Sequence, residues 1–70
     1  MTFADEILKL RSERRLSQAQ LAKELGVSYT SVNRWENGRS LPTKMMLLVI
    51  RRYCEEHHLK FSCEEADRLS

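Results

Sequence analysis

The sequence predicts an all-α fold, a compact bundle of about five short helices with a central helix-turn-helix. Three observations support this prediction. Helix-capping signals recur along the chain, apolar residues between them repeat at helical spacing, and the two glycines and one proline among the 70 residues all fall between predicted helices. The sequence carries no hairpin turn signal and no alternating strand pattern. We expect one domain over residues 1–70, which is either complete or a piece of a longer chain.

The first helix is predicted to begin after Thr2 and to run to about Arg14. Thr2 and Asp5, three residues later, resemble a capping box, in which each side chain accepts a hydrogen bond from the other residue's backbone amide. The expected apolar face consists of Phe3, Ile7, Leu8 and Leu10. Arginines gather at the end of this helix, where they suit the negative end of its dipole.

Two short helices joined by a tight turn follow. Ser17 and Gln20 form a second capping box, and Gly26 is the residue type that most readily ends a helix in the left-handed conformation. Ser28 is the next cap, and Asn37-Gly38 is the next stop signal. The apolar residues at helical spacing are Leu21, Ala22, Leu25, Val32 and Trp35. A turn this tight makes the two helices cross steeply, as in helix-turn-helix units.

A longer helix is predicted from Lys44 to about His57, capped by Thr43, with Pro42 just outside it. One of its sides carries an apolar stripe of Met46, Val49 and Tyr53. A helix that is apolar on more than one side is buried on more than one side. Two interpretations of the stripe stay open: the C-terminal segment folds over it, or it is a dimer or domain interface.

The C-terminal segment is expected to pack back on the domain. Leu59 and Phe61 could return to the core. Ser62 and Glu65 form another capping box, which predicts a short last helix to Leu69.

The segment from Ser17 to Gly38 resembles the lambda-repressor-like, Cro-type (XRE) helix-turn-helix family of bacterial and phage transcription regulators. The matching residues are Leu16-Ser17-Gln18, Leu21-Ala22, Leu25-Gly26-Val27-Ser28, Val32 and Trp35-Glu36-Asn37-Gly38. The resemblance extends from Ile7 to about Cys54, and it implies core positions at Leu47, Leu48, Ile50 and Cys54. It also implies an ion pair between Arg11 and Glu36 that ties the first helix to the third. Arg15 stands where the family often has glycine, which predicts modest backbone strain.

The second helix of the motif, at about Ser28–Asn37, is expected to enter the major groove of double-stranded DNA. Residues opposite its apolar side are predicted to contact bases: Tyr29, Thr30, Asn33 and Arg34. Arg34 is the best candidate for a bidentate bond to guanine. Ser17 and Gln18, at the start of the preceding helix, are predicted to contact a phosphate. The resemblance implies further phosphate contacts near the ends of the recognition helix, at Ser28, Ser31, Asn37 and Arg39.

Net charge is +2, and its distribution agrees with a DNA-binding role without proving it. Residues 1–44 hold eight Lys or Arg against five Asp or Glu, whereas residues 45–70 hold four against five. The expected function is a transcription regulator, most simply a repressor, which binds as a homodimer to a pseudo-palindromic site with half-sites about 34 Å apart. The alternative is a protein-binding adaptor domain, alone or fused to a DNA-modifying enzyme.

Other classes find little support in the sequence. Phosphate-binding loops, HExxH motifs and activated nucleophiles are missing, so we expect neither an enzyme nor a cofactor. A zinc site at Cys54, His57, His58 and Cys63 is a weak hypothesis, because no CxxC accompanies these residues. The longest apolar run, Met45–Ile50, falls far short of the roughly 20 residues that span a bilayer. A cytoplasmic protein with reduced thiols is expected.

Overall fold

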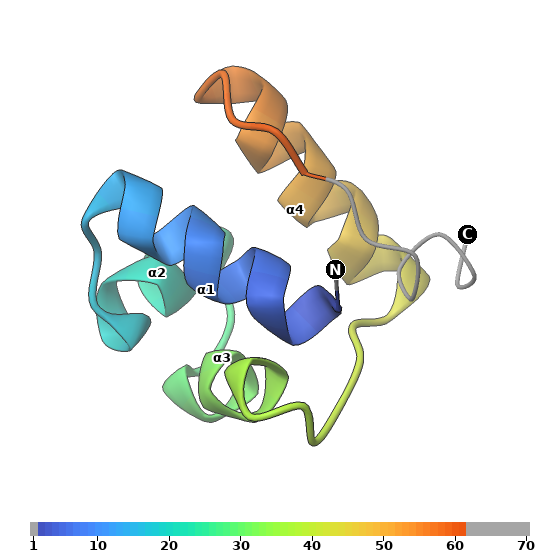
Figure 1. Cartoon of the computed structure of the whole chain (residues 1–70). Coiled ribbons are helices and arrows are strands. Elements are labelled where there is room, and N and C mark those ends of the chain that lie inside the picture. Colours follow the sequence, from blue (N-terminus) through green and yellow to red (C-terminus); the bar gives the residue numbers. More distant parts are fainter. Residues whose placement is uncertain (1, 62–70) are drawn as a thin grey trace.

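The computed structural model describes residues 2–61, and this part of the chain contains four helices and no strand. The helices are α1 (Phe3–Arg14), α2 (Gln18–Leu25), α3 (Tyr29–Glu36) and α4 (Lys44–Glu56). They surround a shared interior. In the view of Figure 1, α1 lies between α3, below it, and α4, above it. The predicted all-α fold is confirmed. The fifth predicted helix, after Ser62, lies outside the described residues.

All four helices begin where the capping signals predict. The Thr2 hydroxyl accepts a hydrogen bond from the Asp5 backbone amide at 3.2 Å, and the Asp5 carboxylate accepts one from the Thr2 amide at 3.4 Å. α2 has the same capping box, formed by Ser17 and Gln20. The hydroxyls of Ser28 and Thr43 each accept a hydrogen bond from the amide three residues later. Each cap satisfies an amide that would otherwise lack a partner at a helix start.

The turn between α1 and α2 carries the backbone strain predicted at Arg15. Arg15 takes the left-handed conformation, with φ 56° and ψ 44°. This conformation places the β-carbon of an L-residue close to the following carbonyl, at a cost of about 1 kcal/mol. Gly26 adopts a similar conformation between α2 and α3, with φ 77°, where the absence of a side chain removes the cost.

The core draws on every helix. Its buried apolar members are Phe3, Ile7, Leu10, Leu21, Ala22, Leu25, Val32, Trp35, Leu47, Ile50, Tyr53 and Cys54. Phe3 packs edge to face against Trp35, with ring centroids 5.7 Å apart, and against Phe61, at 6.1 Å. Leu59 and Phe61 are partly buried against the core, so their predicted return to it is confirmed.

Two residues predicted to be internal are exposed. Leu8 on α1 and Leu48 on α4 both face outward, and Leu48 is 62% exposed. The prediction that they belong to the buried face is therefore wrong. Each directly follows a buried residue, Ile7 or Leu47, and so lies about 100° further around its helix. Only the placement of the neighbouring helices determines on which side the buried face ends.

The predicted stripe of Met46, Val49 and Tyr53 does not form one surface. Tyr53 is only 8% exposed, Met46 is partly buried against the core, and Val49 is 38% exposed. The most exposed large apolar side chains of α4 are Met45, at 71%, and Leu48. An interface on α4 would therefore use the side that these two residues share.

Tyr53 is held by a polar network that joins three helices. Its hydroxyl donates to Glu24 Oε1 on α2 at 2.6 Å and accepts from Arg14 Nε on α1 at 2.9 Å. Arg14 Nη2 also lies 3.2 Å from Glu24 Oε1. The hydrogen bond from Tyr53 lowers the pKa of Glu24 below its usual 4.5, with a further contribution from Arg14, although partial burial opposes the shift.

This network predicts a specific loss of stability in acid. Because the pKa of Glu24 is lower in the folded than in the unfolded chain, its contribution is present above pH 4.5 and is lost as pH falls through the folded value. Glu24→Gln should flatten the fall in unfolding free energy over that window, as measured by urea titrations at a series of pH values. Glu56→Gln, which alters only an exposed pair with Arg52, is the control. If the unfolding free energies of wild type and Glu24→Gln fall equally as pH drops below 4.5, the prediction is contradicted.

Candidate nucleic-acid interface

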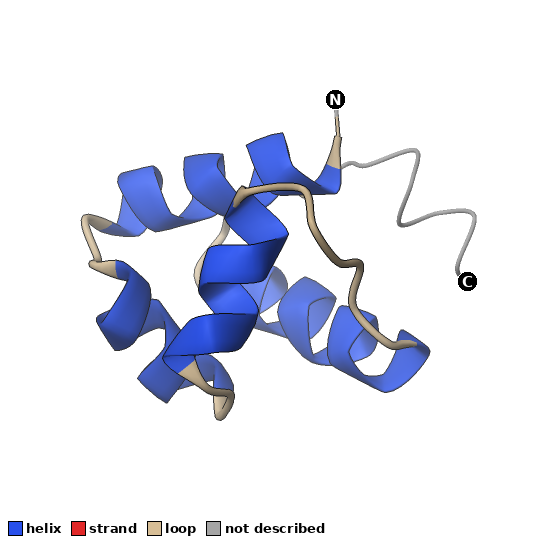
Figure 2. Cartoon of the chain, turned by 90° about the horizontal axis from the view of Figure 1, so that it is seen from below, coloured by secondary structure: helices blue, strands red, loops and turns tan. Residues whose placement is uncertain are grey.

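α3 is the outermost helix on one side of the domain. Its buried side consists of Val32 and Trp35, which anchor it on the core. Viewed from below, α3 lies in front of the other helices, and no described segment covers its free side (Figure 2). The short turn from Gly26 to Ser28 separates α3 from α2, as predicted for a helix-turn-helix.

Three of the four predicted base-contacting residues are exposed on this free side. Tyr29, Thr30 and Arg34 are exposed, and the Arg34 guanidinium forms no hydrogen bond or ion pair within residues 2–61. A guanidinium without an internal partner keeps its five donors for a ligand. Asn33 differs, because it is half-buried and its side-chain amide donates to Gln18 Oε1 at 3.2 Å.

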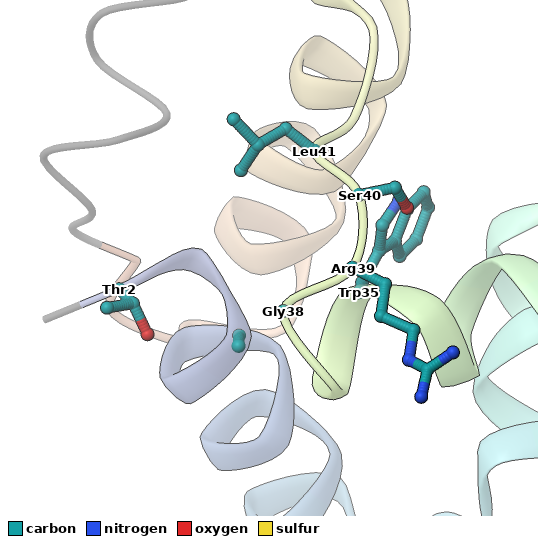
Figure 3. A pocket seen from close by; sticks show the side chains of 7 residues that line it. Thr2, Trp35, Gly38, Arg39, Ser40 and Leu41 are labelled. Atoms are coloured by element: carbon teal, nitrogen blue, oxygen red, sulfur yellow. The ribbon is translucent and has the colours of Figure 1, made fainter.

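The predicted phosphate-contacting residues have unequal freedom to bind. Ser17 is engaged in the α2 capping box, and the hydroxyls of Ser28 and Ser31 pair with each other at 3.1 Å. Asn37 Nδ2 donates to two oxygens of Asn33, the backbone carbonyl at 2.9 Å and Oδ1 at 3.2 Å. Arg39 is exposed, and its side chain extends along the α3 side of the loop, away from Thr2 (Figure 3).

The ion pair expected between Arg11 and Glu36 is present. Arg11 Nε and Nη2 donate to the two carboxylate oxygens of Glu36 at 2.8 and 3.0 Å, and Nη1 donates to the Leu16 carbonyl at 3.1 Å. The side chain of Glu36 is 7% exposed and that of Arg11 is 24% exposed. The hydrogen bond to Glu36 raises the pKa of the Arg11 guanidinium above its usual value. This bidentate pair ties the last turn of α1 to the end of α3.

The structure also contains contacts that sequence reasoning missed. Gln18 Nε2 donates to Glu36 Oε1 at 3.2 Å, so the first residue of α2 is bonded to the last residue of α3. The sequence predicts separate DNA contacts for Gln18 and Asn33, yet their side chains bond to each other. No local pattern signals a pairing of polar residues 15 positions apart.

A hollow of about 580 Å³ lies beside the loop that follows α3. Trp35, Gly38, Ser40 and Leu41 line it from one side, and Thr2 lies across from them (Figure 3). A smaller hollow, of about 460 Å³, is lined by Ser40 and Leu41 of the same loop and by Thr30, Ser31 and Arg34 of α3.

The weak zinc hypothesis receives no supporting geometry from the described residues. Among residues 2–61 no three His, Cys, Asp or Glu side chains are grouped so that they could hold a metal ion, and Cys63 lies outside that range. Cys54 is buried in the core, and burial raises the pKa of its thiol to about 11. A neutral buried thiol is a poor metal ligand.

The helices of residues 2–61 are each too short or too polar to span a bilayer.

Comparison with known proteins extends over most of the chain. A family model described as "Helix-turn-helix" matches residues 7–61. The chain is 36% identical over 53 residues to the HTH-type transcriptional activator BcrR of Enterococcus faecalis, an alignment that covers 76% of this chain. It covers 26% of that relative, so the chain spans about a quarter of the relative's length. No solved structure gives a significant match.

Proposed function

Because the chain belongs to the XRE-type helix-turn-helix family, we propose that it is a transcription regulator that binds specific sites on double-stranded DNA. The observation that carries the proposal is the free side of α3, where Tyr29, Thr30 and Arg34 are exposed while the opposite side is anchored in the core. An α-helix presented in this way fits the major groove. The similarity to a relative named as a transcriptional activator supports the regulatory class.

The three exposed residues of α3 have complementary abilities to recognise bases. Arg34 can donate two hydrogen bonds to O6 and N7 of a guanine, and the methyl group of Thr30 can contact that of a thymine. Tyr29, in the first turn of α3, can reach a base edge or a phosphate. We propose that these three side chains supply the sequence specificity.

Phosphate contacts then position the helix. Arg39 is exposed on the loop after α3 and supplies a charged contact. The start of α2 supplies backbone amides and the positive end of its dipole, which favour an anion. Such contacts set the register of the protein on the duplex but do not distinguish between bases.

Repression is the simplest mode of action, because occupancy of a promoter suffices for it.

We also propose that the protein binds as a homodimer through the outer face of α4. This face contains Met45 and Leu48, the most exposed large apolar side chains among the described residues, and Val49, which follows Leu48 and is 38% exposed. Lys44 lies at its N-terminal end and Glu55 at its C-terminal end, while Arg52 and Glu56 form an exposed ion pair with each other at 3.8 Å. Two copies of α4 packed antiparallel would bring opposite charges together at both ends of an apolar centre. A two-fold axis of this kind matches a pseudo-palindromic site.

Selection from random duplex DNA at two salt concentrations tests the proposal. We expect one recurring pseudo-palindromic site, bound with an affinity that falls steeply with salt. Arg34→Ala should weaken binding to that site by about 1–3 kcal/mol and relax the preference at one base position per half-site.

Arg39→Ala is the matched control for Arg34→Ala. It removes an exposed arginine from the same region, and it should weaken binding evenly across sequences and reduce the slope of affinity against salt. If selection enriches no site and binding is weak at moderate salt, the DNA-binding proposal fails, and the adaptor alternative takes its place. If a site is enriched and Arg34→Ala binds it with the same base preferences as wild type, Arg34 does not contribute to base recognition.

A further inference from the structure

Three side chains from three helices meet on the buried side of α4. Arg14 comes from α1, Glu24 from α2 and Tyr53 from α4, and the contacts among them form a closed triangle with sides of 2.6, 2.9 and 3.2 Å. We propose that this triangle fixes the orientation of α4 relative to the helix-turn-helix and thereby sets the half-site spacing that a dimer accepts. In this proposal all three are positioning residues. The inference rests on the proposed DNA binding and on the proposed dimer through the outer face of α4.

The chemistry of the three groups permits one arrangement of hydrogen bonds. A guanidinium only donates and a carboxylate only accepts, whereas a phenol hydroxyl can do both. The Tyr53 hydroxyl therefore accepts from Arg14 Nε and donates its single hydrogen to Glu24 Oε1. Arg14 Nη2 donates to the same carboxylate oxygen. Because each hydrogen bond holds only within a narrow range of distance and angle, the triangle restricts rotation and sliding of α4 against α1 and α2.

The ring of Tyr53 is held in place as well as its hydroxyl. The residue belongs to the core, and the imidazole of His57 lies against its ring with ring centroids 4.4 Å apart. Burial of Leu47 and Ile50 also holds α4 on the core, but the hydrophobic effect is non-directional. The triangle therefore adds a directional constraint on α4 that burial alone does not supply.

Tyr53 lies on a different side of α4 from the proposed dimer surface. It comes five residues after Leu48, which places it about 7.5 Å further along the helix and about 140° around its axis. The outer face of α4 can therefore contact a second copy while Tyr53 remains bonded to α1 and α2 within its own copy.

The orientation of α4 determines where a dimer places its two recognition helices. If two copies are joined through α4, the position of each α3 relative to the two-fold axis depends on the angle between α4 and the rest of that copy. Symmetry applies any change in this angle to both copies. One added base pair moves a half-site by about 3.4 Å and turns it by about 35° around the duplex. A firmly held α4 therefore selects one spacing, whereas a loosely held α4 also accepts the neighbouring spacings.

Palindromes whose half-sites are moved together or apart by one base pair test this inference with the full chain. We expect wild type to bind the best spacing about ten-fold more tightly than either neighbour, since a misplaced half-site is reached only by deforming the DNA. Tyr53→Phe removes the hydroxyl, and Glu24→Ala removes its acceptor. Each should reduce this preference to about three-fold or less, and the double variant should reduce it no further. The base preferences within a half-site should stay unchanged, because α3 is not altered.

Two control variants separate positioning from loss of charge and loss of stability. Glu24→Gln removes the charge, but its side-chain carbonyl oxygen can take the place of Oε1 in both contacts. Ile7→Val shortens a buried side chain of α1 outside the triangle, and urea titration compares its stability with that of Tyr53→Phe. Both controls should keep the wild-type spacing preference. If Tyr53→Phe does not fold, Glu24→Ala decides the test, because Glu24 is an exposed residue.

The possible outcomes distinguish this inference from the proposals on which it rests. If Tyr53→Phe and Glu24→Ala keep the wild-type preference, if Ile7→Val loses it equally, or if wild type binds all spacings alike, the inference is overturned. If wild type binds palindromes no more tightly than single half-sites, the dimer proposal falls with the inference, while DNA binding stands. If wild type enriches no site, the proposed function falls as well.

Discussion

Arg11→Ala is expected to lower the free energy of unfolding by about 3 kcal/mol. The substitution leaves the Glu36 carboxylate, whose side chain is 7% exposed, without the two hydrogen bonds that compensate its burial. It also frees the Leu16 carbonyl at the turn where Arg15 is strained. A chain of 70 residues has a small margin of stability, so a loss of this size should leave a substantial unfolded fraction near 37 °C.

Urea denaturation followed by circular dichroism measures this effect. Arg52→Ala is the matched control, because Arg52 forms an ion pair with Glu56 at 3.8 Å in which both side chains are largely exposed. The control should change the unfolding free energy by less than about 0.5 kcal/mol. Similar losses for the two variants would show that the Arg11 pair contributes no more than a surface ion pair does.

Replacing both Met45 and Leu48 with glutamate is expected to abolish cooperative binding to a palindromic site. In the proposed dimer the two-fold axis brings four new carboxylates into an apolar centre, where they repel one another and lose hydration. Binding of one copy would no longer favour binding of the second. Affinity for the palindrome should fall about 100-fold, toward that for a single half-site, because the gain from linking two sites is lost.

Titration of duplexes that carry one or two half-sites measures this loss. Affinity for the single half-site should stay the same, since α3 is not altered. Leu8→Glu is the control, because Leu8 is an exposed apolar residue on a different helix, α1. A palindrome bound as tightly by the double variant as by wild type would rule out this face as the dimer surface. Equal defects in the control would indicate a general effect of added negative charge.

The sequence by itself determined where the helices begin and end and which residues anchor the motif. Capping boxes such as that of Ser17 and Gln20 act within four consecutive residues, so their effect is independent of the rest of the fold. The buried pair Val32 and Trp35 also followed from helical spacing, and this pair leaves Tyr29, Thr30 and Arg34 on the free side. The family resemblance added the pairing of Arg11 with Glu36, which spacing alone does not indicate.

Only the tertiary structure decided how the remaining side chains are used. Spacing along α4 suggested a stripe ending at Tyr53, but α1 and α2 cover that residue through Arg14 and Glu24, and Leu48 is exposed instead. Asn33 has the polarity of a base-reading residue, yet Gln18 from another helix engages its amide. Helical periodicity specifies which residues share a side, because it depends on backbone geometry alone. Which side is covered, and which polar group finds a partner, depends on how distant helices pack.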